Sequence, residues 1–339
     1  MATFKIYKLH FTAPLHISDQ HEDLGSSHKM IHSDTLYAAL MSCLAKQGER
    51  LPEDGNLGFT LSSLFPYFQK DKGSTPIYFL PIPMQAKLVE LPDVSEAKKV
   101  KKVQWVDSSL YSLVLLGESL FDRTDKYLLN IQGSYLTTYE LPEDINGSKE
   151  FVCSEVSQRV TLKSRTGEEE AKPFYVDKIL FRYHAGLFFF AEGDTTLLDK
   201  ALQLLSMEGI GTDRNVGFGS FEYSIDTLSI DLPKSANHQL CMSLFIPESK
   251  EQLVALLNSE QVAYDFVRRG GWITTYPYMT LRKNAIYGFL PGSVFCKDEN
   301  KSATVMGKIV DLKPDTAEVE MAHHVWRNGK AIMLPIFIK

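Results

Sequence analysis

A stretch rich in glycine, from Gly209 to Tyr223, constrains the folding of this chain more than any other. It lies between an apolar run with helical spacing and a strand-like alternation, and it holds glycines at positions 209, 211, 217 and 219. Glycine has no Cβ, so its backbone adopts positive φ angles easily and lets a ligand approach closely. We therefore predict a loop that presents its N–H groups to a phosphate, with Arg214 and Asn215 at its tip.

The spacing of these glycines excludes two common phosphate-binding loops. Counted from Gly209, the sixth position of the dinucleotide fingerprint G-x-G-x-x-G is Arg214. The stretch also leaves a helix and enters a strand, the reverse of the order that places a pyrophosphate at a helix N-terminus. No Gly-Lys-Ser/Thr ending is present, so it is not a P-loop. A long helix-to-strand turn without a ligand is the alternative.

The order of apolar patterns predicts an α+β fold with two tandem ferredoxin-like (RRM-like) domains, antiparallel sheets and a glycine-rich loop. In the first half, strand, helix, strand, strand, helix and strand follow one another, with both helices on one face of the sheet. We expect one helix to begin at Ser33 and stop at Gly48, and another to run from Thr195 or Thr196 to Gly209. The predicted strands lie at 4–11, 77–80, 174–183, 186–191 and 218–225.

Changes in composition predict the domain boundaries. Residues 231–237 have the composition of a linker, so we assign residues 1–230 to the first domain and 238–339 to the second. A large insertion at about 84–170 interrupts the first domain, with strands at 103–116 and 135–139. Within it, Arg159 to Gly167 predicts a protruding hairpin. The second domain repeats a shorter cycle of strand, one helix and further strands.

Charge and cysteine usage bound the function. The net charge is −6 and the pI about 5.9, so any nucleic-acid site must be a local patch. The cysteines form no C-x-x-C pair, which argues against a zinc ribbon or a disulfide scaffold and for a reducing compartment. No apolar run approaches the roughly 20 residues of a membrane helix. Because Met1 leads directly into a strand, we expect no signal peptide, a cytoplasmic location and no membrane contact.

Histidines are the first candidates for catalysis. His16, His21, His28 and His32 gather before the first predicted helix. His28 and His32 have the spacing of helical metal ligands, but the helix begins only at Ser33 and no H-E-x-x-H pattern is present. A histidine here can take the proton from a ribose 2′-OH in RNA cleavage. However, no Tyr, Lys or second His lies at a spacing that indicates a catalytic partner. We favour structural or RNA-contact roles and expect no catalytic residue, metal or cofactor.

A window without acidic residues runs from Phe266 to Lys297. It begins with Arg268, Arg269 and Gly270 and interleaves basic side chains with Trp272 and several tyrosines. Guanidinium groups bind phosphates, aromatic faces stack on unpaired bases, and glycines admit close approach. In a chain of negative net charge such a window predicts an RNA-binding patch, although an ordinary half-buried hairpin is the alternative.

Taken together, these motifs resemble the RAMP superfamily of CRISPR proteins. The closest resemblance is to the family of fourth subunits of type III-A (Csm) effector complexes, carried by Ala13 to Ile17 and His32 to Leu40. Residues 159–167, the glycine loop, and residues 283–295 extend it over most of the chain. The resemblance implies a non-catalytic subunit that grips the 5′ handle of the CRISPR RNA (crRNA). It also implies docking to the large polymerase-like subunit and to the backbone RAMP subunit, in antiviral defence.

We predict the RNA-binding residues from these motifs, and expect phosphate affinity from backbone groups because Arg214 is the one basic residue of the glycine loop. The set is His16, His32, Ser33, Lys163, Arg165, Gly209, Gly211, Arg214, Asn215, Gly217, Phe218, Gly219, Arg268, Arg269 and Gly270. Two alternative functions are also consistent with the sequence. A RAMP endoribonuclease would cut repeat RNA with a loop histidine and without metal, and a protein-only scaffold would bind no RNA.

Overall fold

The structure, a computed structural model, describes part of the chain. The described residues are 1–17, 30–84, 102–118, 120, 130–132, 134–139, 141–142, 150–160, 173–297, 304–315 and 321–339. Lys163, Arg165, His21 and His28 lie outside them, as does the tip of the predicted hairpin.

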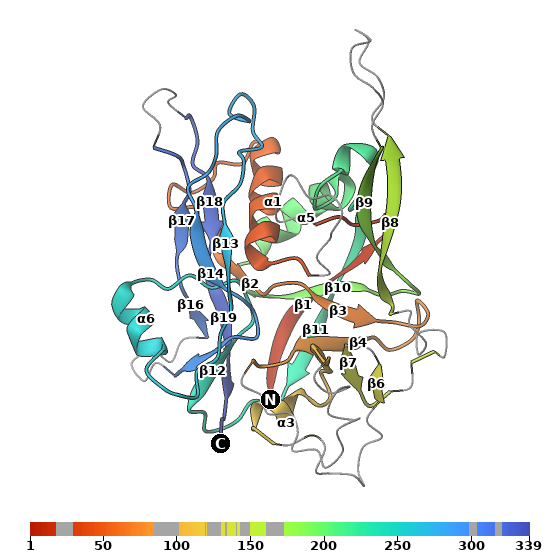
Figure 1. Ribbon diagram of the computed structural model, residues 1–339, viewed down its shortest axis with the longest axis vertical. Helices are drawn as coiled ribbons and strands as arrows, with labels where there is room; N and C mark the ends of the chain where they lie inside the picture. Colours follow the sequence, from red (N-terminus) through yellow and green to blue (C-terminus); the bar gives the residue numbers. More distant parts are fainter. Residues whose placement is uncertain are drawn as a thin grey trace.

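An antiparallel sheet forms the centre of the first unit, and one of its strands is broken into two segments (Figure 1). The strand order is β11-β1-β10, followed by the broken strand β2/β3. This is the order of a split βαβ fold, in which the last strand lies beside the first. The bounds are β1 Ala2–Phe11, β2 Phe59–Leu61, β3 Phe65–Phe68, β10 Gly186–Gly193 and β11 Phe221–Ile230. The predicted ferredoxin-like arrangement is therefore present here.

The strand next to β10 differs from the one predicted. We expected residues 77–80 there, but β2 and β3 occupy this place and Ile77–Pro81 forms β4, one position further out. Every residue of β2 and β3 is buried. A strand covered on both faces is apolar throughout, so its sequence shows no alternation of apolar and polar residues. That alternation is the pattern by which strands are predicted, and these two were therefore missed.

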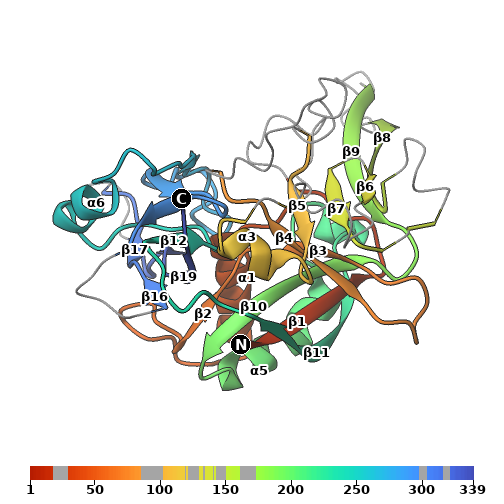
Figure 2. The same cartoon turned by 90° about the horizontal axis from the view of Figure 1, so that it is seen from below.

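Both long helices pack on one face of this sheet (Figures 1 and 2). Helix α1 spans Ser33–Lys46 and α5 spans Thr196–Glu208, as the apolar spacing predicted. The side chains of their N-cap residues do not close the first turns. His32 and Thr195 are the N-cap residues, and neither side chain makes a capping hydrogen bond. Instead, Oδ1 of Asp194 accepts from the N–H of Thr196 at 3.0 Å.

The segment predicted as an insertion extends the sheet beyond β4. Its strands β5, β7 and β6 continue the order outward, and β5 and β7 form a parallel pair. The predicted strand at 103–116 is mostly wrong, because only Trp105–Asp107 is extended and Tyr111–Leu115 forms helix α3. Strands β8 and β9 pair as an antiparallel hairpin that rises on the side of the two helices (Figure 1). The further bounds are β6 Asn130–Gln132, β7 Tyr135–Thr137, β8 Val152–Val160 and β9 Pro173–Phe181.

The C-terminal part of the chain lies on the other side of α1 (Figure 1). Its four-stranded antiparallel sheet has the order β15-β12-β19-β16, and two further hairpins are β13–β14 and β17–β18. Helix α6, Lys250–Leu256, lies at the outer edge. The strands are β12 His238–Cys241, β13 Phe266–Arg269, β14 Ile286–Phe289, β15 Val294–Cys296, β16 Val305–Met306, β17 Ile309–Asp311, β18 Trp326–Asn328 and β19 Ala331–Ile336. The predicted α+β class with antiparallel sheets is confirmed.

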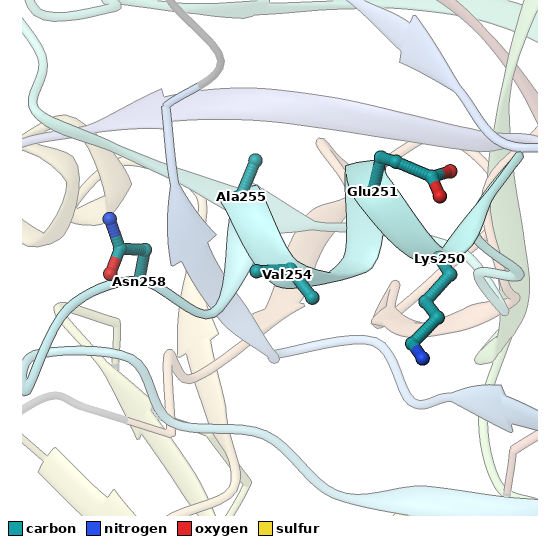
Figure 3. A pocket seen from close by; sticks show the side chains of 5 residues that line it. All are labelled: Lys250, Glu251, Val254, Ala255 and Asn258. Carbon is teal, nitrogen blue, oxygen red and sulfur yellow. The ribbon is translucent and has the colours of Figure 1, made fainter.

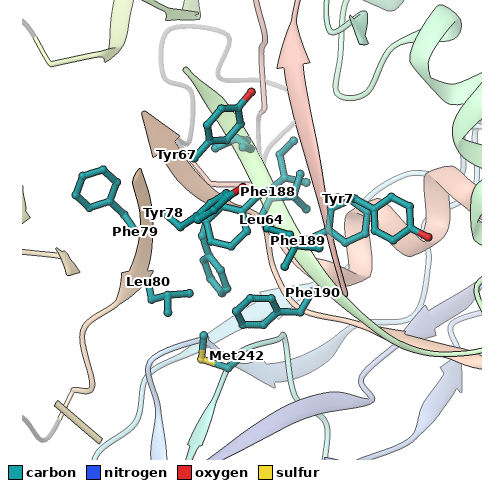
Figure 4. Close-up of a cluster of buried hydrophobic side chains, with 14 of the residues drawn as sticks. Tyr7, Leu64, Tyr67, Tyr78, Phe79, Leu80, Phe188, Phe189, Phe190 and Met242 are labelled. Atoms are coloured by element: carbon teal, nitrogen blue, oxygen red, sulfur yellow. The ribbon is translucent and has the colours of Figure 1, made fainter. Parts of the chain in front are cut away.

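The main hydrophobic core is continuous between these two parts. It contains many aromatic side chains, among them Phe188 and Phe190 of β10 (Figure 4). From beyond the linker, Met242, Ile332 and Leu334 belong to the same buried cluster. The second sheet also covers a smaller cluster around Phe245 and Phe295. The boundary at 231–237 therefore stays a proposal.

None of the helices in the described residues is long and apolar enough to cross a membrane.

Candidate nucleic-acid interface

The glycine loop leaves α5 and returns to β11 through left-handed backbone conformations. The φ angles of the glycines at 209, 211, 217 and 219 are 78°, 97°, 88° and 76°. Asp213 also has a positive φ, 57°, and the short 3-10 helix η1 spans Arg214–Val216. L-residues with a Cβ adopt this region rarely, so the chain needs glycine at these positions for conformation alone.

Three of the four glycines are closed in by backbone. A Cβ added to Gly209 would lie 2.5 Å from the carbonyl oxygen of Phe218, and one on Gly219 would lie 2.0 Å from that of Ile210. A Cβ on Gly211 would lie 2.4 Å from the carbonyl oxygen of His16. These three glycines pack the loop against itself and against the segment after β1.

Gly217 differs from its neighbours because a Cβ added to it would meet nothing within 4 Å. Arg214, Asn215 and Gly217 are all exposed. The open part of the loop is therefore its tip, where two polar side chains stand beside an uncovered glycine.

Three N–H groups on the C-terminal side of the loop already have acceptors within the protein. Those of Gly217 and Phe218 donate to the carbonyls of Arg214 and Asp213, at 3.0 and 3.3 Å. That of Gly219 donates to Pro14 at 2.8 Å. These three N–H groups donate within the protein, so they do not face a phosphate.

Arg159 joins the hairpin to the glycine loop. From the end of β8 its guanidinium donates to Oδ2 of Asp213 at 2.8 Å and lies 4.8 Å from the centre of the Phe218 ring. Phe218 is buried under this contact, so its face is not open to a base. We had not selected Arg159 as a site residue, because its partner follows it by 54 positions and no local pattern reveals the pair.

His16 is completely buried beneath the loop. Its Nδ1 lies 2.5 Å from the carbonyl oxygen of Asp177 in β9, and its own carbonyl accepts from the N–H of Thr212 at 3.0 Å. The side chain therefore fixes the segment after β1 between the hairpin and the glycine loop.

A second group of predicted residues lies at the first turn of α1. Oδ2 of the fully buried Asp34 is 3.1 Å from Nε of Arg269 in β13 and 2.8 Å from a terminal nitrogen of Arg327 in β18. Burial raises the pKa of Asp34, but the positive charges of Arg327, Arg269 and His32 together lower it by more. The pKa of Asp34 therefore lies below its usual value. Arg269, which we predicted as an RNA-binding residue, thus has a protein partner in the interior.

Ser33 connects the same turn to the C-terminal part. Its N–H donates to Oγ of Ser63 at 3.2 Å, and its own Oγ accepts from the N–H of Leu244 at 2.9 Å. The side chain is buried, so its hydroxyl is used inside the protein. His32 precedes it, half-buried, at the N-cap position.

Several exposed residues of the acid-free window lie on strands β13 and β14. Arg268 stands opposite Tyr287 in the antiparallel register, and both are exposed. Phe266 contacts Tyr287 edge to face, with ring centres 5.6 Å apart, and the two rings are 53% and 59% exposed. Gly270 follows, half-buried. Successive side chains of a strand point to opposite faces, so Arg268 faces outward while Arg269 reaches Asp34.

The glycine-loop residues and the residues around Asp34 lie near different turns of helix α1. Arg214 acts electrostatically on Cys43 in its last turns, whereas Arg269 pairs with Asp34 in its first turn. At 1.5 Å per residue these positions are about 13 Å apart along the helix axis. The predicted residues therefore gather toward opposite ends of α1 rather than in one cluster.

A shallow hollow on α6 holds none of the predicted residues (Figure 3). Its lining consists of Lys250, Glu251, Val254, Ala255 and Asn258.

Comparison with known proteins gives a consistent result. Residues 234–336 match the family model of the CRISPR Csm4 C-terminal domain. A protein of Mycobacterium tuberculosis (strain CDC 1551 / Oshkosh), "CRISPR system Cms protein Csm4", is 27% identical over 283 residues, which cover 81% of this chain and 83% of the relative.

Solved structures share the fold. A chain of a Csm3-Csm4 subcomplex from the type III-A interference complex has a TM-score of 0.59 at 18% identity, with 99% of both chains covered. A chain of a Csm1-Csm4 cassette in complex with AMPPNP has a TM-score of 0.58 at 18% identity and covers 100% of this chain and 99% of its own. The family model, the curated relative and the fold confirm the resemblance predicted from the sequence: the chain is similar to Csm4 proteins of CRISPR systems over most of its length.

Proposed function

We propose that this protein is a non-catalytic RNA-binding subunit of a type III-A CRISPR interference complex, in which it grips the 5′ handle of the crRNA. One observation carries this proposal. The glycine loop is rigidly packed by three of its glycines, and the fourth, Gly217, stands uncovered beside the exposed Arg214 and Asn215. The positive φ angle alone accounts for glycine at 217, but the open space around it also leaves room for an RNA backbone beside the two polar side chains.

The proposed RNA surface has two parts. One is the loop tip with Arg214, Asn215 and Gly217, which Arg159 joins to the end of β8 through Asp213. The other is the outer face of β13–β14, where Arg268 stands among exposed aromatic rings that can stack on unpaired bases. We leave Ser33, Arg269, Phe218 and His16 out of direct contact, because their side chains are buried against protein.

The partners follow from the relatives. A Csm1-Csm4 cassette and a Csm3-Csm4 subcomplex are known as structures that match this fold. We therefore propose that this chain docks the large polymerase-like subunit and the backbone RAMP subunit in the cytoplasm. This assembly would place the RNA handle at the foot of the backbone filament.

The alternative function is cleavage of repeat RNA. His16 is buried beneath the loop, so it is not placed to take a proton from a bound 2′-OH. Among the described histidines, His324 has an orienting carboxylate, with Nδ1 2.7 Å from Oδ2 of Asp311, and its side chain is 52% exposed. We expect pure protein to leave labelled repeat RNA intact with and without EDTA. Specific cuts that disappear in His324→Ala or His32→Ala would establish the nuclease instead.

Purification from the native host tests the proposal most directly. We expect crRNA with an intact 5′ handle to co-purify, together with the large and backbone subunits, when bound RNA is sequenced and proteins are identified by mass. Recovery of the partners without RNA after removal of free nucleic acid would support the protein-only scaffold.

A further inference from the structure

The hairpin of β13 and β14 continues past the ends of these two strands. Trp272 and Arg282 face each other in an antiparallel bridge, and the N–H of Ile273 donates to the carbonyl of Leu281 at 2.9 Å. The two chain segments therefore run side by side well beyond β13 and β14. We call residues 266–289 the extended ribbon.

An aromatic ring holds the guanidinium of Arg282 at the end of this ribbon. The Cζ atom of Arg282 lies 4.5 Å from the centre of the Trp272 ring. Arg282 is exposed and Trp272 is half-buried, so the ring supports a cation on the outside of the protein. A guanidinium stacked in this way loses rotational freedom, and the N–H donors along its edge stay available to another acceptor.

No acidic side chain of the ribbon neutralises this cation. The sequence contains no Asp or Glu from Phe266 to Lys297, and Arg282 forms no ion pair with another residue in the described part of the chain. Arg268, nearer the other end of the ribbon, is also exposed and likewise has no ion-pair partner among the described residues. Two unpaired guanidiniums on a surface without acids attract an anionic partner.

Contacts with the rest of the C-terminal part fix the far end of the ribbon. The hydroxyl of Tyr278 accepts from the N–H of Ala322 at 3.0 Å, and its ring meets His323 edge to face, with ring centres 5.6 Å apart. On the returning segment, the N–H of Asn284 donates to the carbonyl of Leu312 at 2.9 Å. A cation on a fixed ribbon is ordered before it binds, which lowers the entropy cost of binding.

We propose that the extended ribbon binds single-stranded RNA along its length, with Arg282 as a second phosphate-binding residue besides Arg268 and with Trp272 as the residue that positions Arg282. This inference rests on the function proposed above. The four residues from Arg268 to Trp272 span no more than about 14 Å, so a strand of a few nucleotides reaches both guanidiniums. Charge alone would also suit an acidic protein segment. The exposed rings of Phe266 and Tyr287 favour RNA, because unpaired bases stack on them.

Salt titrations with labelled handle RNA and the full chain test the phosphate contact. We expect Arg282→Gln to bind about fivefold more weakly, as for the loss of one exposed ion pair. Its log–log salt slope should fall by about 0.7, and that of the double variant Arg268→Ala/Arg282→Gln by about 1.4, because each arginine contacts one phosphate of the same strand. Arg50→Gln removes an exposed arginine outside the ribbon and should leave the slope unchanged. A wild-type slope in Arg282→Gln would overturn the site.

A double-mutant cycle tests the positioning role of Trp272. Trp272→Leu should weaken RNA binding by the same factor as Arg282→Gln, because the guanidinium loses the ring face that orients it. Trp272→Phe keeps an aromatic face and should bind close to wild type. Trp272→Leu combined with Arg282→Gln should bind no more weakly than Arg282→Gln alone, whereas additive losses would show that Trp272 acts independently of Arg282. Thermal melts establish that each variant is folded, and the exposed Arg282 variants test the site even where a Trp272 variant is not.

The same measurements separate the failure of this site from the failure of the proposed function. If the wild type binds handle RNA and Arg282→Gln binds it equally well, the proposed function stands and the site is overturned. Unchanged RNA affinity together with loss of the large or backbone subunit from purified Arg282→Gln would assign the ribbon to a protein partner and overturn its assignment to RNA. Absence of RNA binding by the wild type itself would overturn the proposed function, and this site with it.

Discussion

Two glycines only two positions apart have different physical roles in the loop. Gly217 is exposed and has open space where a Cβ would point, whereas Gly219 is buried against the carbonyl of Ile210. Both have positive φ angles, so both carry the same conformational constraint. The difference between them is therefore steric, and valine substitutions can separate binding from folding.

We expect Gly217→Val to abolish binding of handle RNA while lowering stability by only about 1–2 kcal/mol, the cost of a side chain in the left-handed region. Gly219→Val should unfold the protein at a much lower temperature, because its Cβ would lie 2.0 Å from a backbone oxygen. RNA affinity and thermal unfolding of both variants provide the measurement.

Gly58→Val is the matched control, since Gly58 has a φ of 85° and also has nothing within 4 Å of an added Cβ. It should lose similar stability and bind RNA normally. If Gly217→Val bound RNA as well as this control, the loop tip would have no role in binding.

At the scale of elements, strand β13 divides its two arginines between two functions. Arg268 faces outward beside Tyr287, and Arg269 faces inward to Asp34. The strand therefore both presents a cation to the surface and attaches the C-terminal part to α1. The sequence shows two adjacent arginines but not which of them is buried, because strand phase depends on the tertiary partner.

Alanine substitutions should separate these functions. Arg268→Ala should weaken RNA binding, lower the log–log salt slope by about 0.7 and leave the Tm unchanged, since one phosphate contact is lost. Arg269→Ala should lower stability by up to about 3 kcal/mol, because it removes one of the two arginines that pair with the buried carboxylate of Asp34. Salt titrations of RNA binding and thermal melts check both. An unchanged slope in Arg268→Ala would remove the β13–β14 face from the proposed surface.

At the scale of the whole molecule, the two proposed domains share one core. Met242, Ile332 and Leu334 from beyond the linker pack with residues of the first sheet. Trp326 of β18 also covers Gly55, where an added Cβ would lie 2.6 Å from its ring. An interface built like a domain interior couples the stability of its two sides.

We therefore expect a single cooperative unfolding transition in urea. Trp105 reports on the first part, and Trp272 and Trp326 report on the second. Fluorescence of variants that keep only one of these groups should give coincident transitions, as two-state unfolding requires. Two separated midpoints would show that the parts fold independently, despite their shared core.

The sequence predicted the parts of the fold that local patterns encode. Helices α1 and α5 repeat apolar residues at helical spacing, and β10 and β11 follow the predicted order. Strands β2 and β3 were missed because burial on both faces removes the alternation. The site was predicted less well. A run of glycines does not reveal which of them pack, and the link between Asp34 and Arg327 spans nearly the whole chain.

The ion pairs between Asp34 and arginines of the C-terminal part restrict recombination between relatives at the linker. The carboxylate belongs to the first part, whereas both arginines lie beyond the linker. Consider a chimaera that joins this first part to the second part of a relative without matching arginines. Its buried Asp34 carboxylate would lack both of these ion-pair partners. Recombination between relatives at the linker would thus be tolerated only where all three side chains travel together or change together.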